Sequence, residues 1–306
     1  MLDALRMLIF DLGSYLMATM EHLYVRPFEE KDIDFAYEMN VREQWNDRKD
    51  DIKRMFNCEP NGSFIAEVEY SPVGHVFAIS YGKLGWIGML IVKSEYRKKG
   101  VGTLLTKKAA DYLLHCGVET IKLEAVPQIS NLYRKLGFIY EFDSLRFKRA
   151  SGKTISTCSD SPALIEKKNL TKIAEFDADY FGADRTGVLA SLFQENPELC
   201  FVSYDGSEVA GYTMCRRAKR GYTLGPFVCN PENRQVAREL LARCIHKLGL
   251  SKTLYVGVPA VNERAIEILR EFGFDQYSKS VRMRLGKNVK NERPNGIFAI
   301  GGPMKG

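Results

Sequence analysis

The chain has 306 residues, of which 45% are hydrophobic and 27% are charged, values typical of a globular protein with room for two domains. Its formal net charge of +6, from 44 basic and 38 acidic residues, suits an anionic ligand but is too small to indicate a nucleic-acid partner. Seven scattered cysteines without a C-x-x-C pair and four widely spaced histidines indicate a reducing cytoplasm and argue against a metal site.

Residues 1–22 are predicted to form an extension ahead of the first strand. The segment is apolar, but Asp3, Arg6 and Asp11 interrupt it, and the uncharged run after Asp11 is too short to cross a bilayer. We therefore expect no membrane contact and assign this extension no function.

A β-rich region with two helices follows the extension. Helices are predicted over residues 33–41 and 50–56, from their apolar spacing. Strands are expected over residues 23–28, 63–70, 74–81 and 85–92. Turn residues at 71–72 and 82–83 separate the last three strands, so an antiparallel meander is predicted.

The most informative segment is the basic glycine turn at residues 97–102 (Arg-Lys-Lys-Gly-Val-Gly), which separates a strand from a helix over residues 103–114. A helix start leaves backbone N–H groups unpaired, and these groups together with the helix dipole favour a phosphate. Gly100 and Gly102 lack Cβ atoms, so a ligand can approach the backbone, and three basic side chains add positive charge. An ordinary strand–helix turn is the alternative interpretation.

The first region closes with a strand over residues 120–126, a short helix over 130–136 that ends at Gly137, and a strand over 138–148. Antiparallel strands followed by a strand–helix–strand crossover are typical of an α+β domain. Residues 150–161 are rich in Ser, Thr, Gly and Lys and are predicted to form a linker.

The second region repeats part of this order. Its predicted helices and strands cover residues 174–193, 199–204, 209–216, 222–229, 231–248, 253–258 and 262–272. Residues 133–138 (Tyr-Arg-Lys-Leu-Gly-Phe) and 269–274 (Leu-Arg-Glu-Phe-Gly-Phe) match in sequence and in order. We therefore predict two copies of one fold, with domains at residues 23–150 and 151–306.

The order Arg-x-x-Gly-x-Gly after a strand, with residues 132–138 further on, resembles the GNAT (Gcn5-related) N-acetyltransferases. Residues 23–148 resemble a complete GNAT domain. Residues 181–185 and 297–302 resemble a subgroup in which a second, degenerate GNAT-like domain follows the first. The resemblance implies two tandem α+β domains, each a mixed, mostly antiparallel sheet flanked by helices.

The resemblance also implies acetyl-CoA as cosubstrate of the first domain. A splayed strand would pair with the pantetheine arm, and the glycine turn would hold the pyrophosphate. The residues implied are Leu90, Ile91, Val92, Arg97, Lys98, Lys99, Gly100, Val101, Gly102, Thr103 and Asn131. The family's asparagine usually lies several residues before Asn131, where this chain has Val126.

The second domain departs from the family pattern where a cofactor would bind. Residues 229–237 contain no glycine, and Pro231 removes a backbone donor. Leu269 stands at the position that corresponds to Tyr133. We therefore expect one active site per chain, with the second domain shaping the acceptor cleft.

Acyl transfer to an amine needs a neutral amine and a proton for the thiolate that leaves. The resemblance implies Tyr133 as this acid, although a core aromatic between two leucines is the alternative. Three candidates for the base stay open: Glu124, and Glu67 with Glu69, which are expected to share one strand face. Each of the three is alternatively an exposed carboxylate at a sheet edge.

Two further residues are candidates for acceptor binding. Asp184 and Arg185 follow a glycine turn, and they either line a substrate cleft or form a structural ion pair. The resulting prediction is an acetyl-CoA-dependent N-acetyltransferase for a small-molecule or amino acid-like amine. The alternatives are a non-catalytic acyl-CoA sensor or scaffold and a protein N-acetyltransferase. The sequence leaves the acceptor and the oligomeric state open.

Overall fold

The computed structural model describes residues 22–150, 162–289 and 292–306. The predicted extension over residues 1–22 and the predicted linker lie almost entirely outside these residues. The chain forms two compact units. Unit 1 contains the described residues up to Leu123, together with Gln128–Ile139 and Arg284–Lys287. Unit 2 contains Glu124–Pro127, Tyr140–Met283 and the described residues from Asn288 to Gly306.

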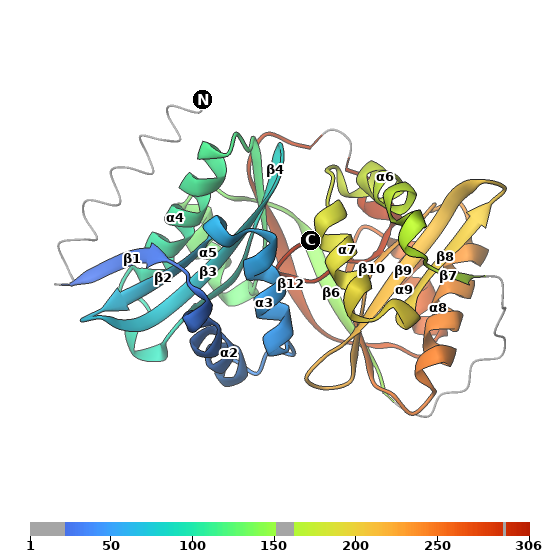
Figure 1. The fold of residues 1–306 in the computed structure, drawn as a ribbon, viewed down its shortest axis with the longest axis horizontal. Helices are drawn as coiled ribbons and strands as arrows, with labels where there is room; N and C mark the ends of the chain where they lie inside the picture. The colour runs from blue at the N-terminus through green and yellow to red at the C-terminus, as the bar shows by residue number, and fades with distance from the viewer. Residues whose placement is uncertain (1–21, 151–161, 290–291) are drawn as a thin grey trace. The chain divides into compact units, whose positions relative to one another are not determined.

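The sheet of unit 1 has the strand order β1-β2-β3-β4-β5, and the end of β12 lies beyond β5 (Figure 1). These strands are β1 (Leu23–Pro27), β2 (Ser63–Val68), β3 (Ser71–Tyr81), β4 (Leu84–Val92), β5 (Thr120–Ala125) and β12 (Asp275–Gly286). The first four are antiparallel neighbours, whereas β4 and β5 are parallel. This mixture agrees with the meander and crossover predicted from the sequence.

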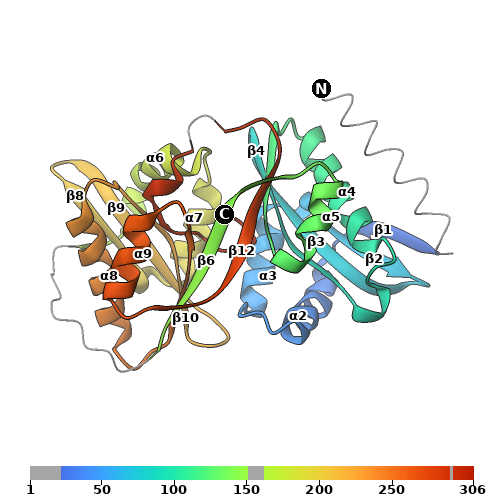
Figure 2. The ribbon, with the colours of Figure 1, turned by 180° about the vertical axis from the view of Figure 1, so that it is seen from behind.

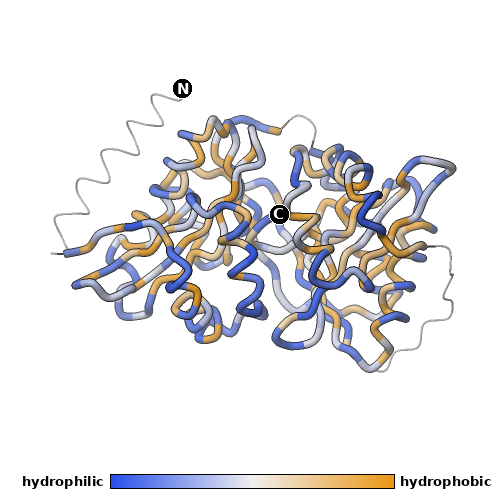
Figure 3. The backbone as a smooth tube through the Cα atoms, in the orientation of Figure 1, coloured by the Kyte–Doolittle hydropathy of each residue, from blue (hydrophilic) through white to orange (hydrophobic). Residues whose placement is uncertain are grey.

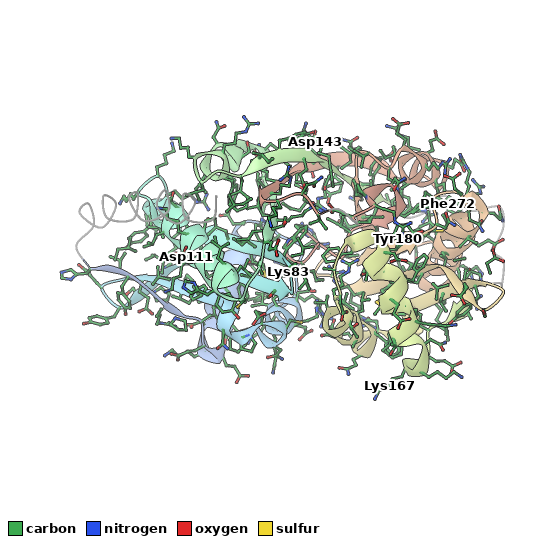
Figure 4. The ribbon with its side chains drawn as sticks, turned by 90° about the horizontal axis from the view of Figure 1, so that it is seen from above. Lys83, Asp111, Asp143, Lys167, Tyr180 and Phe272 are labelled. Atoms are coloured by element: carbon green, nitrogen blue, oxygen red, sulfur yellow. The ribbon has the colours of Figure 1, made fainter. Side chains whose placement is uncertain are left out.

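The helices of unit 1 are amphipathic and cover its sheet. They are α2 (Ile33–Arg42), α3 (Lys49–Cys58), α4 (Val101–His115) and α5 (Ser130–Lys135). In α4 the side chains of Val101, Leu105, Ala109 and Leu113 repeat every four residues and are buried. The opposite, polar face carries Asp111, labelled in Figure 4. The α4 helix is therefore fixed by its apolar stripe.

Unit 2 has the strand order β12-β6-β11-β10-β9-β8-β7, and β13 pairs with β10. Its further strands are β6 (Ile139–Arg149), β7 (Ala163–Leu164), β8 (Cys200–Asp205), β9 (Glu208–Arg217), β10 (Tyr222–Cys229), β11 (Leu254–Pro259) and β13 (Ile297–Ala299). Its helices are α6 (Leu170–Phe181), α7 (Thr186–Glu195), α8 (Arg234–Leu248) and α9 (Glu263–Glu271). In both units the hydrophobic stretches follow the strands (Figure 3). No helix of the described residues is long and apolar enough to span a membrane.

The β6 strand belongs to unit 2, although the sequence analysis placed it at the end of the first domain. It pairs antiparallel with β11, from Ser144 opposite Pro259 to Arg149 opposite Leu254, and runs beside β12 (Figure 2). The buried Arg149 side chain also donates from Nε to the Phe272 carbonyl at 3.0 Å, after α9. The units therefore do not divide at residue 150, because a strand pattern does not specify the partner strand.

The apolar stripe of α4 gives a stability prediction. Leu105→Ala should lower the free energy of unfolding by about 2–5 kcal/mol, because the fully buried side chain leaves a cavity. Leu104→Ala is the matched control, since Leu104 is only half-buried and should cost less. Urea denaturation followed by far-UV circular dichroism measures both. Equal losses for the two variants would contradict the assigned packing.

Candidate active site

The β4 strand carries a bulge at the point where it leaves β5. Its parallel pairing with β5 runs from Leu84 to Ile87 and ends there. Opposite β3 the register shifts by one residue, and Met89 has a φ of 52°, as expected of a bulge. In the described part of the chain, Gly88–Val92 therefore faces no strand on the β5 side. This open edge includes the predicted residues Leu90, Ile91 and Val92, although the Val92 carbonyl already accepts a hydrogen bond from Arg97 Nε.

The glycine turn after β4 presents free backbone amides. Gly100 has a φ of 87°, a left-handed conformation that glycine adopts without strain, and it is the N-cap of α4. The first hydrogen bond of the helix runs from the Leu104 amide to the Gly100 carbonyl at 3.0 Å. The amides of Val101, Gly102 and Thr103 precede this ladder, so together with the helix dipole they suit an anion.

Gly102 is not required by the packing of the protein itself. A Cβ atom there would lie 3.5 Å from Leu132 Cδ1, 3.8 Å from Val92 Cγ2 and 3.9 Å from Leu90 Cδ2, all ordinary contacts. The missing Cβ therefore favours the close approach of a ligand to the helix backbone. The same distances show that the amides lie beside apolar side chains from β4 and α5. A ligand with a phosphate next to a less polar arm fits this arrangement.

The three basic residues of the turn have different positions. Arg97 Nε donates to the Val92 carbonyl at 2.9 Å, and its guanidinium also pairs with Glu43, so Arg97 ties the turn to the end of β4. Lys99 lies over the Tyr96 ring with Nζ 5.5 Å from the centroid. Lys98 and Lys99 are exposed and supply the charge that a phosphate would meet.

Tyr133 lies on α5 and is buried, with 4% of its surface exposed. Its ring packs edge-on against Phe138, with centroids 5.9 Å apart. Among the described residues its hydroxyl has no hydrogen-bond partner, and burial raises the pKa of Tyr133 above its ordinary value. The phenol is therefore protonated at neutral pH, as a proton donor must be. Asn131, also predicted to contact the cofactor, is exposed on the same helix.

Glu67 and Glu69 do not share a strand face, so that expectation is wrong. The β2 strand ends at Val68, and Glu69 lies in the hairpin turn with a φ of 48°. Glu67 is buried on β2, where it accepts hydrogen bonds from Arg26 Nε at 2.8 Å and from the Tyr24 hydroxyl. The alternation pattern fails here because the strand ends two residues earlier than predicted.

The Glu124 side chain is fully buried, and its carboxylate already accepts hydrogen bonds from three side chains. It accepts hydrogen bonds from Ser144 Oγ at 2.7 Å, from Arg282 Nε at 2.7 Å and from the Ser280 hydroxyl. Burial alone would raise the pKa of Glu124, but Arg282 and Arg146 together with the serine hydroxyls hold it below its ordinary value. A lowered pKa makes a weak base, so this geometry favours a structural role.

Asp184 and Arg185 do not pair with each other. Arg185 is buried and donates from Nε and Nη2 to the Asp177 carboxylate at 2.7 and 2.8 Å, and from Nη1 to the Gly306 carbonyl at 3.0 Å. Asp184 instead accepts from the Thr186 amide at 2.8 Å. Arg185 therefore forms a structural ion pair, which is one of the two predicted alternatives. Its partner is Asp177, a residue that the sequence did not indicate.

His75 lies at the bulge, and no sequence motif pointed to it. It faces Ile91 across the β3–β4 ladder, is 0% exposed, and packs edge-on against the rings of Phe35 and Phe77. Neither of its ring nitrogens has a hydrogen-bond partner among the described residues. Burial lowers the pKa of His75 to about 3, so the imidazole is neutral in the folded chain.

These features together define a class of site. A bulged strand that parts from its parallel neighbour, followed by a glycine turn and a helix start, suits a diphosphate joined to an extended arm that can pair with backbone groups. An acyl-CoA has this chemistry. Within the described residues there is no cluster of three or more His, Cys, Asp or Glu side chains that could hold a metal ion.

Comparisons with known proteins agree with this class. The model described as Acetyltransferase (GNAT) family matches residues 17–138, and the model described as Acetyltransferase (GNAT) domain matches residues 173–299. Holothin acyltransferase of Pseudoalteromonas sp. (strain SANK 73390) is 25% identical over 269 residues, 88% of this chain and 90% of that protein.

Two solved structures show the same fold. A putative acetyltransferase from Pyrococcus horikoshii has a TM-score of 0.77 at 22% identity and covers 94% of this chain and 97% of its own. A tandem GNAT protein from the clavulanic acid biosynthesis pathway has a TM-score of 0.59 at 12% identity, covering 87% and 98%. The chain therefore belongs to the GNAT acetyltransferase family, with two GNAT domains in tandem, and is an N-acyltransferase.

The buried imidazole predicts a pH dependence of stability. An unfolded histidine titrates near 6.5, so the folded chain binds fewer protons than the unfolded chain as the pH falls from about 6.5 towards 3. Stability is therefore lost over this interval. Between pH 7 and pH 5, His75→Leu should lose less free energy of unfolding than the parent chain, by up to about 2 kcal/mol.

Urea denaturation at the two pH values measures the difference. His115→Leu is the matched control for the loss of a histidine, because His115 lies exposed at the end of α4. Equal pH dependence in the parent chain and in His75→Leu would contradict burial of a neutral imidazole.

Proposed function

We propose that the chain transfers an acetyl group from acetyl-CoA to the amine of a small molecule, with one active site, in unit 1. The observation that supports this proposal most directly is that the open edge of β4 leads into the amides of residues 101–103, which precede the first hydrogen bond of α4. The family generally uses acetyl-CoA, which supports the donor. The relative named for acyl transfer to holothin supports a small-molecule acceptor.

Each part of the site has a task in this proposal. The amides of Gly100–Thr103 hold the pyrophosphate, with Lys98 and Lys99 adding charge, and Arg97 keeps the turn in register with β4. The backbone of Leu90–Val92, apart from the Val92 carbonyl that Arg97 occupies, pairs with the amide-bearing arm. These contacts hold the thioester in a fixed place, which lowers the entropic cost of its reaction with the amine.

Tyr133 provides the proton for the leaving group. The amine nitrogen attacks the thioester carbonyl carbon, the C–S bond breaks, and the thiolate receives the phenolic proton. The attacking nitrogen loses one proton as it becomes the amide, and this proton, passed through solvent, restores the Tyr133 phenol. A phenol with a raised pKa stays protonated until the thiolate forms. Because Glu67 and Glu124 are occupied and Glu69 is exposed in a hairpin turn, we propose that the proton of the ammonium leaves to solvent.

The start of α8 in unit 2 supports a single site. There the Asn233 side chain accepts a hydrogen bond from the Val236 amide at 3.2 Å, so the helix start is capped by its own chain. In unit 1 the corresponding N-cap is Gly100, which has no side chain to do this. The start of α8 therefore offers a pyrophosphate one amide donor fewer than an uncapped helix start.

Tyr133→Phe separates an enzyme from a non-catalytic sensor. Loss of the acid should lower kcat by about 10²–10⁴-fold while CoA affinity stays unchanged. Thiol release with a panel of small amines, and calorimetry with CoA, measure the two quantities. Full turnover in Tyr133→Phe would show that Tyr133 is only a packing residue of the core. The absence of thiol release by the parent chain with any amine would favour the non-catalytic sensor.

Gly102→Ala separates the stability of α4 from its ligand binding. Alanine fits the space and favours a helix, so the free energy of unfolding should stay equal or rise by up to about 1 kcal/mol. The added methyl group should nevertheless weaken CoA binding by about tenfold or more, because it occupies the approach to the amides. Gly100→Asp, which adds a negative charge at the N-cap, should abolish binding.

The matched control is Gly187→Ala in α7, where a Cβ atom would meet nothing within 4 Å. It should leave CoA binding unchanged in calorimetry. Unchanged CoA affinity in both Gly102→Ala and Gly100→Asp would place the cofactor elsewhere.

A further inference from the structure

The strands β10 and β11 of unit 2 part in the same way as β4 and β5 of unit 1. They pair in parallel only from Tyr222 opposite Leu254 to Leu224 opposite Val256. Directly after this, the register of β10 against β9 shifts between Leu224 and Phe227. A parallel pair that ends at a bulge is thus present in both units, and it creates an opening between two strands each time.

The opening in unit 2 is filled by the closing segment, residues 297–306, whose first part is β13. On one side Ile297 and Ala299 pair antiparallel with β10, opposite Val228 and Phe227. On the other side the Ile300 amide donates to the Gly257 carbonyl of β11 at 2.9 Å. The closing segment therefore uses its own backbone to satisfy both separated strands.

Side chains hold the closing segment at both ends. Asn262, the N-cap of α9, donates from Nδ2 to the Ile297 carbonyl at 3.0 Å. The Phe298 ring packs on Phe227 with centroids 5.2 Å apart. At the far end the buried Arg185 guanidinium donates to the Gly306 carbonyl at 3.0 Å.

The residues that border the opening leave room for the closing segment. A Cβ atom on Gly225 would lie 2.0 Å from the Ile300 carbonyl oxygen, and Gly225 has a φ of 135°. A larger residue at this position therefore excludes the segment. By contrast, in the described part of unit 1 no segment pairs with the open edge of β4.

We propose that the opening between β10 and β11 is a second pantetheine-type site, and that it binds residues 297–306 of the chain in place of an acyl-CoA arm. Both occupants are extended chains that offer amide N–H and C=O groups to the two strands. The comparison with unit 1 rests on the proposed function. The seated segment closes this opening in unit 2, and the cap on α8 removes one amide donor as well.

The test uses the full chain with Gly100→Asp, so that unit 1 binds no CoA, and with a protease site inserted between residues 290 and 291. After cleavage the fragment 291–306 should remain bound, because its contacts are noncovalent. A millimolar excess of pantetheine should then displace it, as measured by gel filtration and mass spectrometry. This readout needs no acetyl transfer, so the failure of the proposed function would be seen separately.

Two asparagine variants provide a matched pair. Asn262→Ala removes a cap and the hydrogen bond to Ile297, whereas Asn233→Ala removes only a cap. The fragment should leave faster from the cleaved Asn262→Ala chain than from the cleaved Asn233→Ala chain. Equal rates of fragment release from the two chains would show that the Asn262 hydrogen bond does not retain the segment.

Fragment retention that pantetheine leaves unchanged would overturn the proposal, because the segment would then be an ordinary strand of the sheet. If the cleaved chain unfolds, the same competition is read in the uncut chain. There pantetheine should accelerate hydrogen exchange of the Ile300 amide, which is bonded to Gly257. Unchanged exchange would again overturn the proposal.

Discussion

Two parallel strands that separate after a bulge leave backbone N–H and C=O groups without partners, and the organisation of both units follows from how these groups are satisfied. In unit 1 the bulge at Met89 separates β4 from β5, and the free edge leads into the uncapped start of α4. In unit 2 the gap between β10 and β11 contains β13. Among the described residues, the same backbone constraint thus leaves an open strand edge in unit 1 and produces an intramolecular contact in unit 2.

The helix that follows each bulge strengthens this difference. Gly100 leaves the first amides of α4 unpaired, whereas Asn233 caps α8 with its own side chain. A free helix start attracts an anion because its amides and its dipole are uncompensated. A capped start loses one of these donors.

Buried carboxylates in this chain are held by fixed donors, which limits the groups available for proton transfer. Glu124 is surrounded by Ser144, Ser280 and Arg282, and Asp177 binds Arg185 and the Tyr212 hydroxyl. Such pairs compensate the cost of removing charge from water, and breaking one would leave the other charge unpaired. These carboxylates therefore stabilise strand positions, whereas among the described residues the Tyr133 hydroxyl and the His75 imidazole have no hydrogen-bond partner.

The resemblance to the GNAT family implied Tyr133 as the acid, whereas the sequence by itself determined the glycine turn, the order of helices and strands, and the duplication. These are local features, set by side-chain periodicity and by glycines close together in the chain. The tertiary structure alone decided that β6 pairs with β11, that Glu124 meets Arg282, that Arg185 meets Asp177, and that residues 297–306 lie between β10 and β11. Each of these contacts joins residues whose partner is chosen by packing, and a local pattern carries no information about that choice.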